Sequence, residues 1–183
     1  MDKPLTINRT IGKSGSTVKR ISDTLERDLN NHIQAEAFSS QIYLAMAMWC
    51  EDCGYMGGAV RFRKYAEEEL VHMKKLYQYI LDRDCLPITP AIPQPQNTYR
   101  DILDVIETSY KHEIEISESY NKTAALALKE QDFTIFELAQ WFIHEQIEEE
   151  AKFNNLIDQY NILMKTGISG IALMEFDEIL GEI

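Results

Sequence analysis

Apolar residues recur at steps of three, four or seven along four long stretches of the chain. This spacing is typical of α-helices that bury one face, because a helix completes a turn every ~3.6 residues. The first helix is predicted to start between residues 16 and 23 and to run to about residue 50. Further helices are predicted at about residues 59–84, 100–129 and 133–166, with a short fifth helix at 171–183. The segment Asp23-Thr24-Leu25-Glu26 resembles a capping box at the first helix start. No alternating stretch predicts a strand, so the expected fold class is all-α.

The lengths of the connections predict how the four long helices are arranged. Glycines at 54, 57 and 58 mark a short turn after the first helix, and residues 130–132 mark another after the third. Helices joined by such turns are antiparallel neighbours. The middle connection has about 16 residues and four prolines, which cannot continue a helix. It spans about 50 Å when extended, enough to run the length of a helix, so the second and third helices are predicted to be parallel.

The bulk properties exclude several classes of protein. The 183 residues suit one domain with a substantial core. The longest apolar run, residues 42–50, is far shorter than the ~20 residues of a membrane helix. No apolar block follows the basic N-terminal residues, so no secretory signal is expected and the expected compartment is the cytoplasm. The formal charge of −12 argues against nucleic-acid binding and suits a protein that attracts cations.

Two further features carry no assigned function. Residues 1–17 are polar and lack a sustained period, so they are predicted to form a flexible arm ahead of a domain at 18–183. The three cysteines, Cys50, Cys53 and Cys85, form no disulfide framework. A single CxxC without a second pair lacks the ligands of a structural zinc site, so these thiols are expected to be structural or incidental.

Each long helix carries one acidic residue on its apolar face, near its midpoint. Glu36, Glu69, Glu113 and Glu149 each have an apolar or aromatic residue seven positions before and seven after, and residues seven apart share a helix face. Helix midpoints lie at one height in a bundle, whichever way each helix runs. His72 follows Glu69 by one turn. The sequence therefore predicts that four carboxylates and an imidazole converge inside the bundle.

The competing interpretation is a solvated acidic face, because two of these acids belong to the runs 67–69 and 148–150. The coincidence across four helices favours burial. Buried carboxylates repel one another and must take up protons or bind a cation, and oxygen ligands with one imidazole suit iron or manganese. In metal-free protein, Glu36→Leu or Glu113→Leu is therefore expected to raise the melting temperature.

Residues 20–183 resemble the bacterial non-haem ferritins. The resemblance rests on Tyr43, Glu69-x-x-His72, Tyr110-Lys111-His112-Glu113 and Trp141-x-x-x-Glu145-Gln146-x-Glu148-Glu149. It implies a ferritin-like four-helix bundle with one long crossover between helices 2 and 3 and a short fifth C-terminal helix.

The resemblance also implies roles for individual residues. Glu36, Glu69 and His72 would hold a first iron ion, and Glu69 would bridge to a second ion. The second ion would be held also by Glu113 and Glu149, with Gln146 beside the pair. The acids of a third site, found in many bacterial ferritins, would be Glu68, Glu145, Glu148 and Glu149. Tyr43 is either a one-electron donor or a packed ring with a satisfied hydroxyl, and Trp141 either packs against the site or is plain core.

The implied function is iron storage with ferroxidase activity. Such a protein oxidises Fe(II) to Fe(III) with O2 or H2O2 and keeps the ferric mineral inside a homo-oligomeric cage, by resemblance one of twenty-four subunits. Ile171, Met174 and Ile179 would then lie near a symmetry axis of the cage. No haem, nucleic acid or membrane partner is expected. The remaining histidines, His32, His112 and His144, are expected at the surface or beside the ligands.

Four alternatives remain open. A rubrerythrin-like oxygenase or peroxidase repeats Glu-x-x-His on two helices, whereas this chain has Gln146-x-x-Glu149. Bacterioferritin has a haem-ligating methionine after the bridging glutamate, where this chain has Leu70. A DNA-protecting mini-ferritin binds metal between subunits and lacks the C-terminal helix. A purely structural bundle leaves the buried acids unexplained.

Overall fold

A computed structural model describes residues 20–165 and 169–182. The predicted arm at 1–17 and residue 166, the predicted end of the fourth helix, lie outside the described residues. The helices are α1 (Asp23–Asp52), α2 (Met56–Asp82), α3 (Ile102–Glu130), α4 (Phe133–Met164) and α5 (Ser169–Gly181). The described residues contain no strand, so the all-α prediction is confirmed. None of the helices in these ranges is long and apolar enough to cross a membrane.

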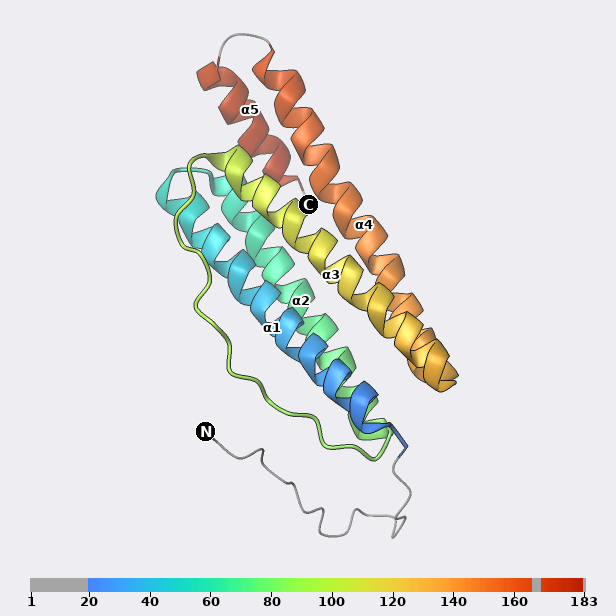
Figure 1. The fold of residues 1–183 in the computed structure, drawn as a ribbon. Helices are drawn as coiled ribbons and strands as arrows, with labels where there is room; N and C mark the ends of the chain where they lie inside the picture. Colours follow the sequence, from blue (N-terminus) through green and yellow to red (C-terminus); the bar gives the residue numbers. More distant parts are fainter. Residues whose placement is uncertain (1–19, 166–168, 183) are drawn as a thin grey trace.

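The long crossover between α2 and α3 follows the outer side of α1 over the length of the bundle (Figure 1). The Asn30 side chain of α1 accepts a hydrogen bond from the main-chain N–H of Ile88 at 2.7 Å, and the Gln34 side chain donates one to the carbonyl of Ala91 at 2.9 Å. The crossover returns the chain to the end at which α2 begins. The predicted parallel arrangement of α2 and α3 is therefore confirmed.

Side-chain caps define where three of the helices begin. The N–H of Leu25 donates to the hydroxyl of Ser22 at 3.2 Å, so the cap of α1 is Ser22 and not Asp23 as predicted. Asp101 and Asp132 accept equivalent bonds at the starts of α3 and α4. A side-chain oxygen at this position satisfies an N–H that has no partner within the helix.

The beginning of α2 differs from the prediction because α5 supplies its cap. The helix starts at Met56, three residues earlier than expected, and its own cap residue makes no side-chain hydrogen bond. Instead, the N–H groups of Gly57 and Gly58 donate to the carboxylate of Asp177 at 3.0 and 2.9 Å. In return, Arg61 Nε donates to the carbonyl of Leu180 at 2.7 Å, near the end of α5. A Cβ on Gly57 would overlap the main-chain oxygen of Asp177, so only glycine permits this close approach.

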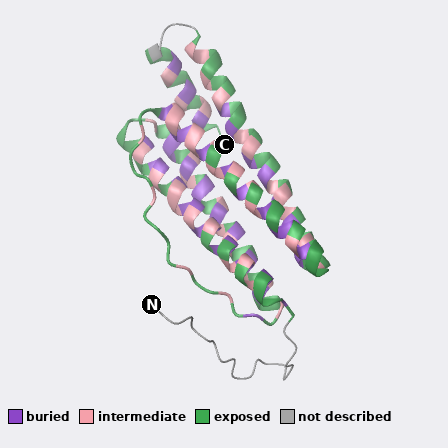
Figure 2. Ribbon diagram, in the orientation of Figure 1, coloured by how far each residue is buried: buried purple, intermediate pink, exposed green. Residues whose placement is uncertain are grey.

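Buried residues lie on all four long helices of the bundle (Figure 2). The apolar ones form two clusters with a polar layer between them. On α1, one cluster ends at Ile33 and the other begins at Tyr43; on α3, the corresponding limits are Ile106 and Ile116. The helices α2 and α4 show the same interruption. The buried polar residues in these interruptions include the serines Ser39, Ser40 and Ser109 and the candidate ligands Glu36, Glu69, His72, Glu113, Gln146 and Glu149. The prediction that the acids lie at one height inside the bundle therefore agrees with the arrangement of the core.

The cysteines are free thiols, with Cys50 and Cys85 buried and Cys53 exposed.

Candidate metal centre

Three side chains from α1 and α2 bring their ligand atoms together inside the bundle. One ligand atom from each of Glu36, Glu69 and His72 lies within 4.8 Å of the other two. The Nδ1 atom of His72 is 3.3 Å from a carboxylate oxygen of Glu69 and 3.6 Å from one of Glu36. All three residues are buried, with at most 8 % of their surface exposed. Among the described residues, this is the only group of three or more such side chains that meets this distance.

Aromatic residues from α3 and α4 surround this group. The hydroxyl of Tyr120 donates a hydrogen bond to Glu36. The His72 ring is in edge contact with Trp141 and Phe142, with centroid distances of 5.7 and 5.9 Å. These contacts fix the orientation of the imidazole, and water has little access to it. Trp141, which is half-buried, therefore packs against the site.

The cluster without metal holds protons that a metal ion would replace. Burial raises the pKa of the Glu69 carboxyl well above its usual value, and the neighbouring carboxylates raise it further. For Glu36, burial acts in the same direction, but hydrogen bonds with His72, Glu69 and Tyr120 outweigh it and the pKa is lowered. Burial opposes a charge on His72, yet its bonds to the two carboxyls raise its pKa to about 10. His72 is therefore an imidazolium at neutral pH, paired with an ionised Glu36.

The contribution of α3 centres on Glu113, which is 2 % exposed. Its carboxylate accepts hydrogen bonds from the hydroxyl of Tyr43 and, at 2.7 Å, from the amide of Gln146. Burial raises the pKa of Glu113 above its usual value, although these two bonds lower it. The Gln146 amide also donates to the main-chain carbonyl of Glu113 at 3.2 Å. Gln146 is thus held beside the predicted ligand, with its N–H groups directed toward α3.

The acid on α4 is paired with a cation that the sequence analysis missed. Glu149 is 6 % exposed, and its Oε1 atom is 2.7 Å from the ammonium of Lys152. Burial raises the pKa of Glu149, whereas the bond and the charge of Lys152 lower it. The three-residue spacing of the pair along α4 was visible in the sequence and could have indicated the contact.

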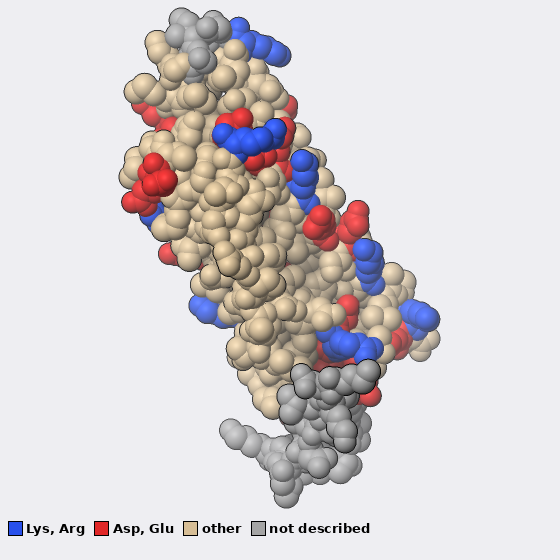
Figure 3. Space-filling view, turned by 60° about the vertical axis from the view of Figure 1, so that its left-hand side comes forward, with Lys and Arg blue, Asp and Glu red and all other residues tan. Residues whose placement is uncertain are grey.

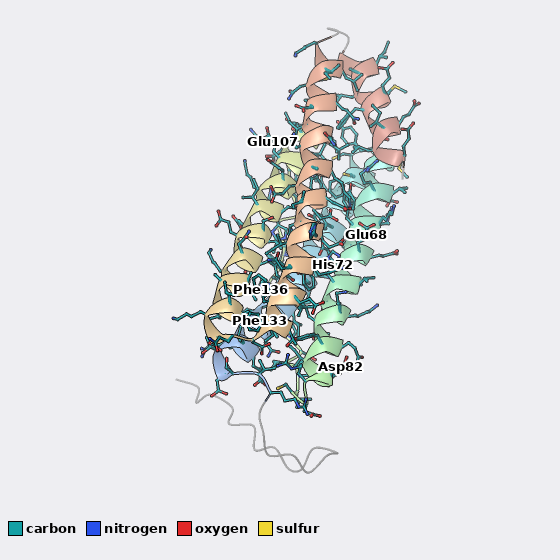
Figure 4. The ribbon with its side chains drawn as sticks, turned by 90° about the vertical axis from the view of Figure 1, so that its right-hand side faces the viewer. Glu68, His72, Asp82, Glu107, Phe133 and Phe136 are labelled. Carbon is teal, nitrogen blue, oxygen red and sulfur yellow. The ribbon has the colours of Figure 1, made fainter. Side chains whose placement is uncertain are left out.

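Of the four acids of the predicted third site, Glu149 is buried, whereas the other three are half-buried or exposed. Glu68 is half-buried on α2, and its carboxylate is 4.0 Å from Lys152. Figure 4 shows Glu68 and His72 between α2 and α4. Glu145 is half-buried and Glu148 is exposed. Within the described ranges, neither belongs to the group of close ligand atoms.

The other histidines occupy three different environments. His32 is buried and stacks on Tyr120, with ring centroids 3.9 Å apart. His112 is half-buried and shares a hydrogen bond of 2.7 Å with the hydroxyl of Ser39. His144 is exposed. None of the three lies in the cluster of close ligand atoms. His32 stacks on Tyr120, which binds Glu36, and His112 is in edge contact with Tyr43, which binds Glu113.

Comparison with known proteins identifies the family. A family model described as a ferritin-like domain matches residues 26–163, which include every predicted ligand. The chain belongs to the ferritin family. It is 34 % identical over 163 residues to a probable bacterial non-haem ferritin-like protein of Haemophilus influenzae, covering 89 % of this chain and 97 % of the relative.

Two other ferritins show the same relationship. A bacterial non-haem ferritin of Escherichia coli is 34 % identical over 139 residues, covering 76 % of this chain and 84 % of the relative. The structure of an open-pore ferritin from Archaeoglobus fulgidus superposes with a TM-score of 0.85 at 28 % identity, covering 89 % of this chain and 99 % of that one. The bundle with one long crossover and a short C-terminal helix is therefore a ferritin fold.

Proposed function

We propose that this ferritin oxidises Fe(II) at a di-iron centre within each subunit and stores the ferric product as a mineral inside a homo-oligomeric cage. The observation that carries the proposal is the buried cluster of Glu36, Glu69 and His72. Carboxylate oxygens and one imidazole nitrogen form a donor set that suits iron. Burying three ionisable groups together is costly unless a cation binds there.

The residues divide between two iron substrates. Glu36, Glu69 and His72 hold the first ion, and His72 and Glu69 release their protons as it binds. Glu69 bridges to the second ion, which Glu113 and Glu149 also hold. Each Fe(II) gives up one electron. One O2 takes up these two electrons and two protons and leaves as H2O2, or one H2O2 takes them up with two protons and leaves as two water molecules.

The second position binds its ion more loosely than the first. A second Glu-x-x-His motif on the fourth helix would supply a glutamate and an imidazole as ligands. This chain has Gln146 in place of that glutamate and Glu149 in place of the histidine, so the second position lacks an imidazole ligand. Gln146 supports the site by donating to Glu113. Loose binding favours transfer of the oxidised ion inward, past Glu68, Glu145 and Glu148, over retention. This property distinguishes a storage protein from a rubrerythrin-like enzyme that keeps both ions.

Tyr43 is positioned to serve as a one-electron donor to the centre. Its hydroxyl donates to Glu113, and its ring is in contact with Tyr65 and Phe153, with centroids 5.8 and 6.0 Å away. Burial and the adjacent carboxylates raise its pKa well above the usual value, so the phenol keeps its proton until an electron is withdrawn. Glu113 is the acceptor for that proton.

Assembly into a cage is supported by the outer surface of α1 and the crossover. Large apolar side chains are exposed there, at Leu44, Met48, Leu86, Ile88 and Ile92. Figure 3 shows few charged side chains over the middle of this face. Apolar surface of this extent is typical of a protein interface. The proposed partner is a second copy of the chain.

Aerobic addition of Fe(II) tests the proposal when absorbance and molecular mass are followed together. A large assembly that turns amber and elutes with its iron is the expected result. The His72→Ala variant should lose the fast phase of oxidation, whereas His144→Ala, which changes an exposed histidine on α4, should keep it. Equal initial rates in wild type and His72→Ala would contradict the assigned site. A small species that hydroxylates an organic substrate would favour the oxygenase alternative.

A further inference from the structure

Lys152 places a permanent positive charge at the edge of the second metal position. Its ammonium lies 2.7 Å from Oε1 of Glu149 on the same helix and 4.0 Å from a carboxylate oxygen of Glu68 on α2. It also lies 5.8 Å from the centre of the Tyr65 ring. The side chain is 38 % exposed, whereas that of Glu149 is 8 % exposed. The lysine therefore reaches from the surface to a buried acid.

The pair of Lys152 and Glu149 places an ammonium group beside a carboxylate that the second ion needs as a ligand. A charge-assisted hydrogen bond occupies one oxygen of Glu149, and the positive charge repels any metal ion that approaches the same carboxylate. The first position differs, because the close partners of Glu36 and Glu69 include His72, whose imidazole nitrogen can itself bind a metal ion. An ammonium group has no lone pair to offer a metal ion, so Lys152 must move away from Glu149 before an ion can bind this oxygen. Glu68 offers a second carboxylate within a short displacement.

We propose that Lys152 competes with the second metal ion for Glu149. Its ammonium holds Glu149 until the ion displaces it, and this competition keeps binding at the second position weak. This inference rests on the proposed function and deepens it. It assigns the looseness of the second position to a specific side chain as well as to the missing imidazole. Metal ions then bind in a fixed order, first at Glu36, Glu69 and His72 and afterwards at Glu113 and Glu149.

Anaerobic titration with Co(II) tests this role without oxidation chemistry. The assembled wild-type protein is compared with Lys152→Met, which removes the charge at similar length, and with Lys152→Arg, which keeps it. Lys122→Met is the matched control, because Lys122 is an exposed lysine on α3 that pairs with the exposed Glu118. Ligand-field absorbance and calorimetry report the affinity of each ion separately.

Lys152→Met should tighten the second Co(II) by about fivefold or more and leave the first unchanged. Lys152→Arg and Lys122→Met should both resemble wild type. The lysine role is overturned if Lys152→Met tightens the second ion no more than Lys122→Met does. If the wild-type protein binds no second ion at all, the di-iron proposal itself fails. If it binds a second ion that Lys152→Met does not tighten, only the lysine role fails.

A second measurement detects the displacement in the unmodified protein. Acetylation of lysines by acetic anhydride, followed by peptide mass analysis, gives a rate for each side chain. Acetylation of Lys152 should be slow in metal-free protein and several-fold faster once the second Co(II) is bound, because the ammonium has left Glu149. The rate at Lys122 should not change. An unchanged rate at Lys152 after full loading would overturn the proposed displacement.

Discussion

The two halves of the metal centre satisfy their buried acids in different ways. In the half formed by α1 and α2, Glu36, Glu69 and His72 are partners of one another, so the same atoms that would bind a metal stabilise the site without it. In the half formed by α3 and α4, Glu113 is bonded to Tyr43 and Gln146, and Glu149 to Lys152.

This difference indicates how each half responds to a metal ion. The first half is preorganised, and an ion needs only to displace protons. The second half holds its acids with groups that are not metal ligands in this arrangement, so an ion must break hydrogen bonds and an ion pair. We therefore expect the two halves, which have similar acids, to bind metal ions with different strength and in a set order.

The largest expected effect comes from removing the imidazole of the first half. His72→Ala should weaken the first Co(II) by at least about 100-fold and abolish the fast oxidation of Fe(II), because a ligand and its fixed orientation are both lost. Glu149→Ala, in the second half, should weaken only the second ion. Calorimetric titration of both variants measures this, with His144→Ala as the control. Equal losses of the first ion in both variants would remove the distinction between the halves.

Stability without metal should also separate the halves. Glu36→Leu leaves His72 and the hydroxyl of Tyr120 without their partner in the core, which should lower the free energy of unfolding by about 3 kcal/mol. Glu113→Leu should change it by less, about 1 kcal/mol or below, because relief from burying an acid with a raised pKa offsets the two lost hydrogen bonds. Urea denaturation of chelator-treated protein measures both. A rise in stability for Glu36→Leu would show that repulsion between the acids dominates.

The expected loss of stability in Glu36→Leu differs from the expectation based on sequence, in which every buried acid is repelled by the others. The periodicity predicted the helices and the inward position of Glu36, Glu69, Glu113 and Glu149, because burial follows from a helix repeat. It could not show that the pKa of Glu36 is lowered by its neighbours, since that depends on Tyr120 from a different helix.

Two further differences between the sequence prediction and the structure have separate origins. The start of α2 differs from the predicted start at Ala59 because its cap is supplied by Asp177 of α5, which is distant in sequence and carries no local signal. Lys152 was overlooked because a single lysine on a polar helix face is ordinarily solvated. The sequence pattern identifies its partner, Glu149, as a metal ligand. Spacing alone does not show whether a buried acid binds a metal ion or the ammonium group of a lysine.

The pH dependence of metal binding should differ between the halves. The pKa of about 10 for His72 in metal-free protein means that a proton leaves as the first ion binds at neutral pH. The affinity for the first Co(II) should therefore rise by at least about tenfold per unit between pH 7 and 9, and more steeply where Glu69 also gives up a proton. The second ion displaces Lys152, which remains charged, so its affinity should rise less steeply. Calorimetry in buffers of different ionisation enthalpy counts the protons released. A first ion that binds without proton release would contradict the protonated state of the cluster.

The smallest effects are expected from removing two tyrosine hydroxyls, one bonded to an acid of each half of the metal centre. Tyr120→Phe removes the donor to Glu36 and should weaken the first ion by about tenfold, since groups that orient a ligand typically contribute this much to metal affinity. Tyr43→Phe removes the donor to Glu113 and should alter the second ion alone. Co(II) titration of the two variants gives both affinities. If Tyr43→Phe weakened the first ion as much as Tyr120→Phe does, the halves would be coupled through Glu69, and the independence argued from their separate partners would be lost.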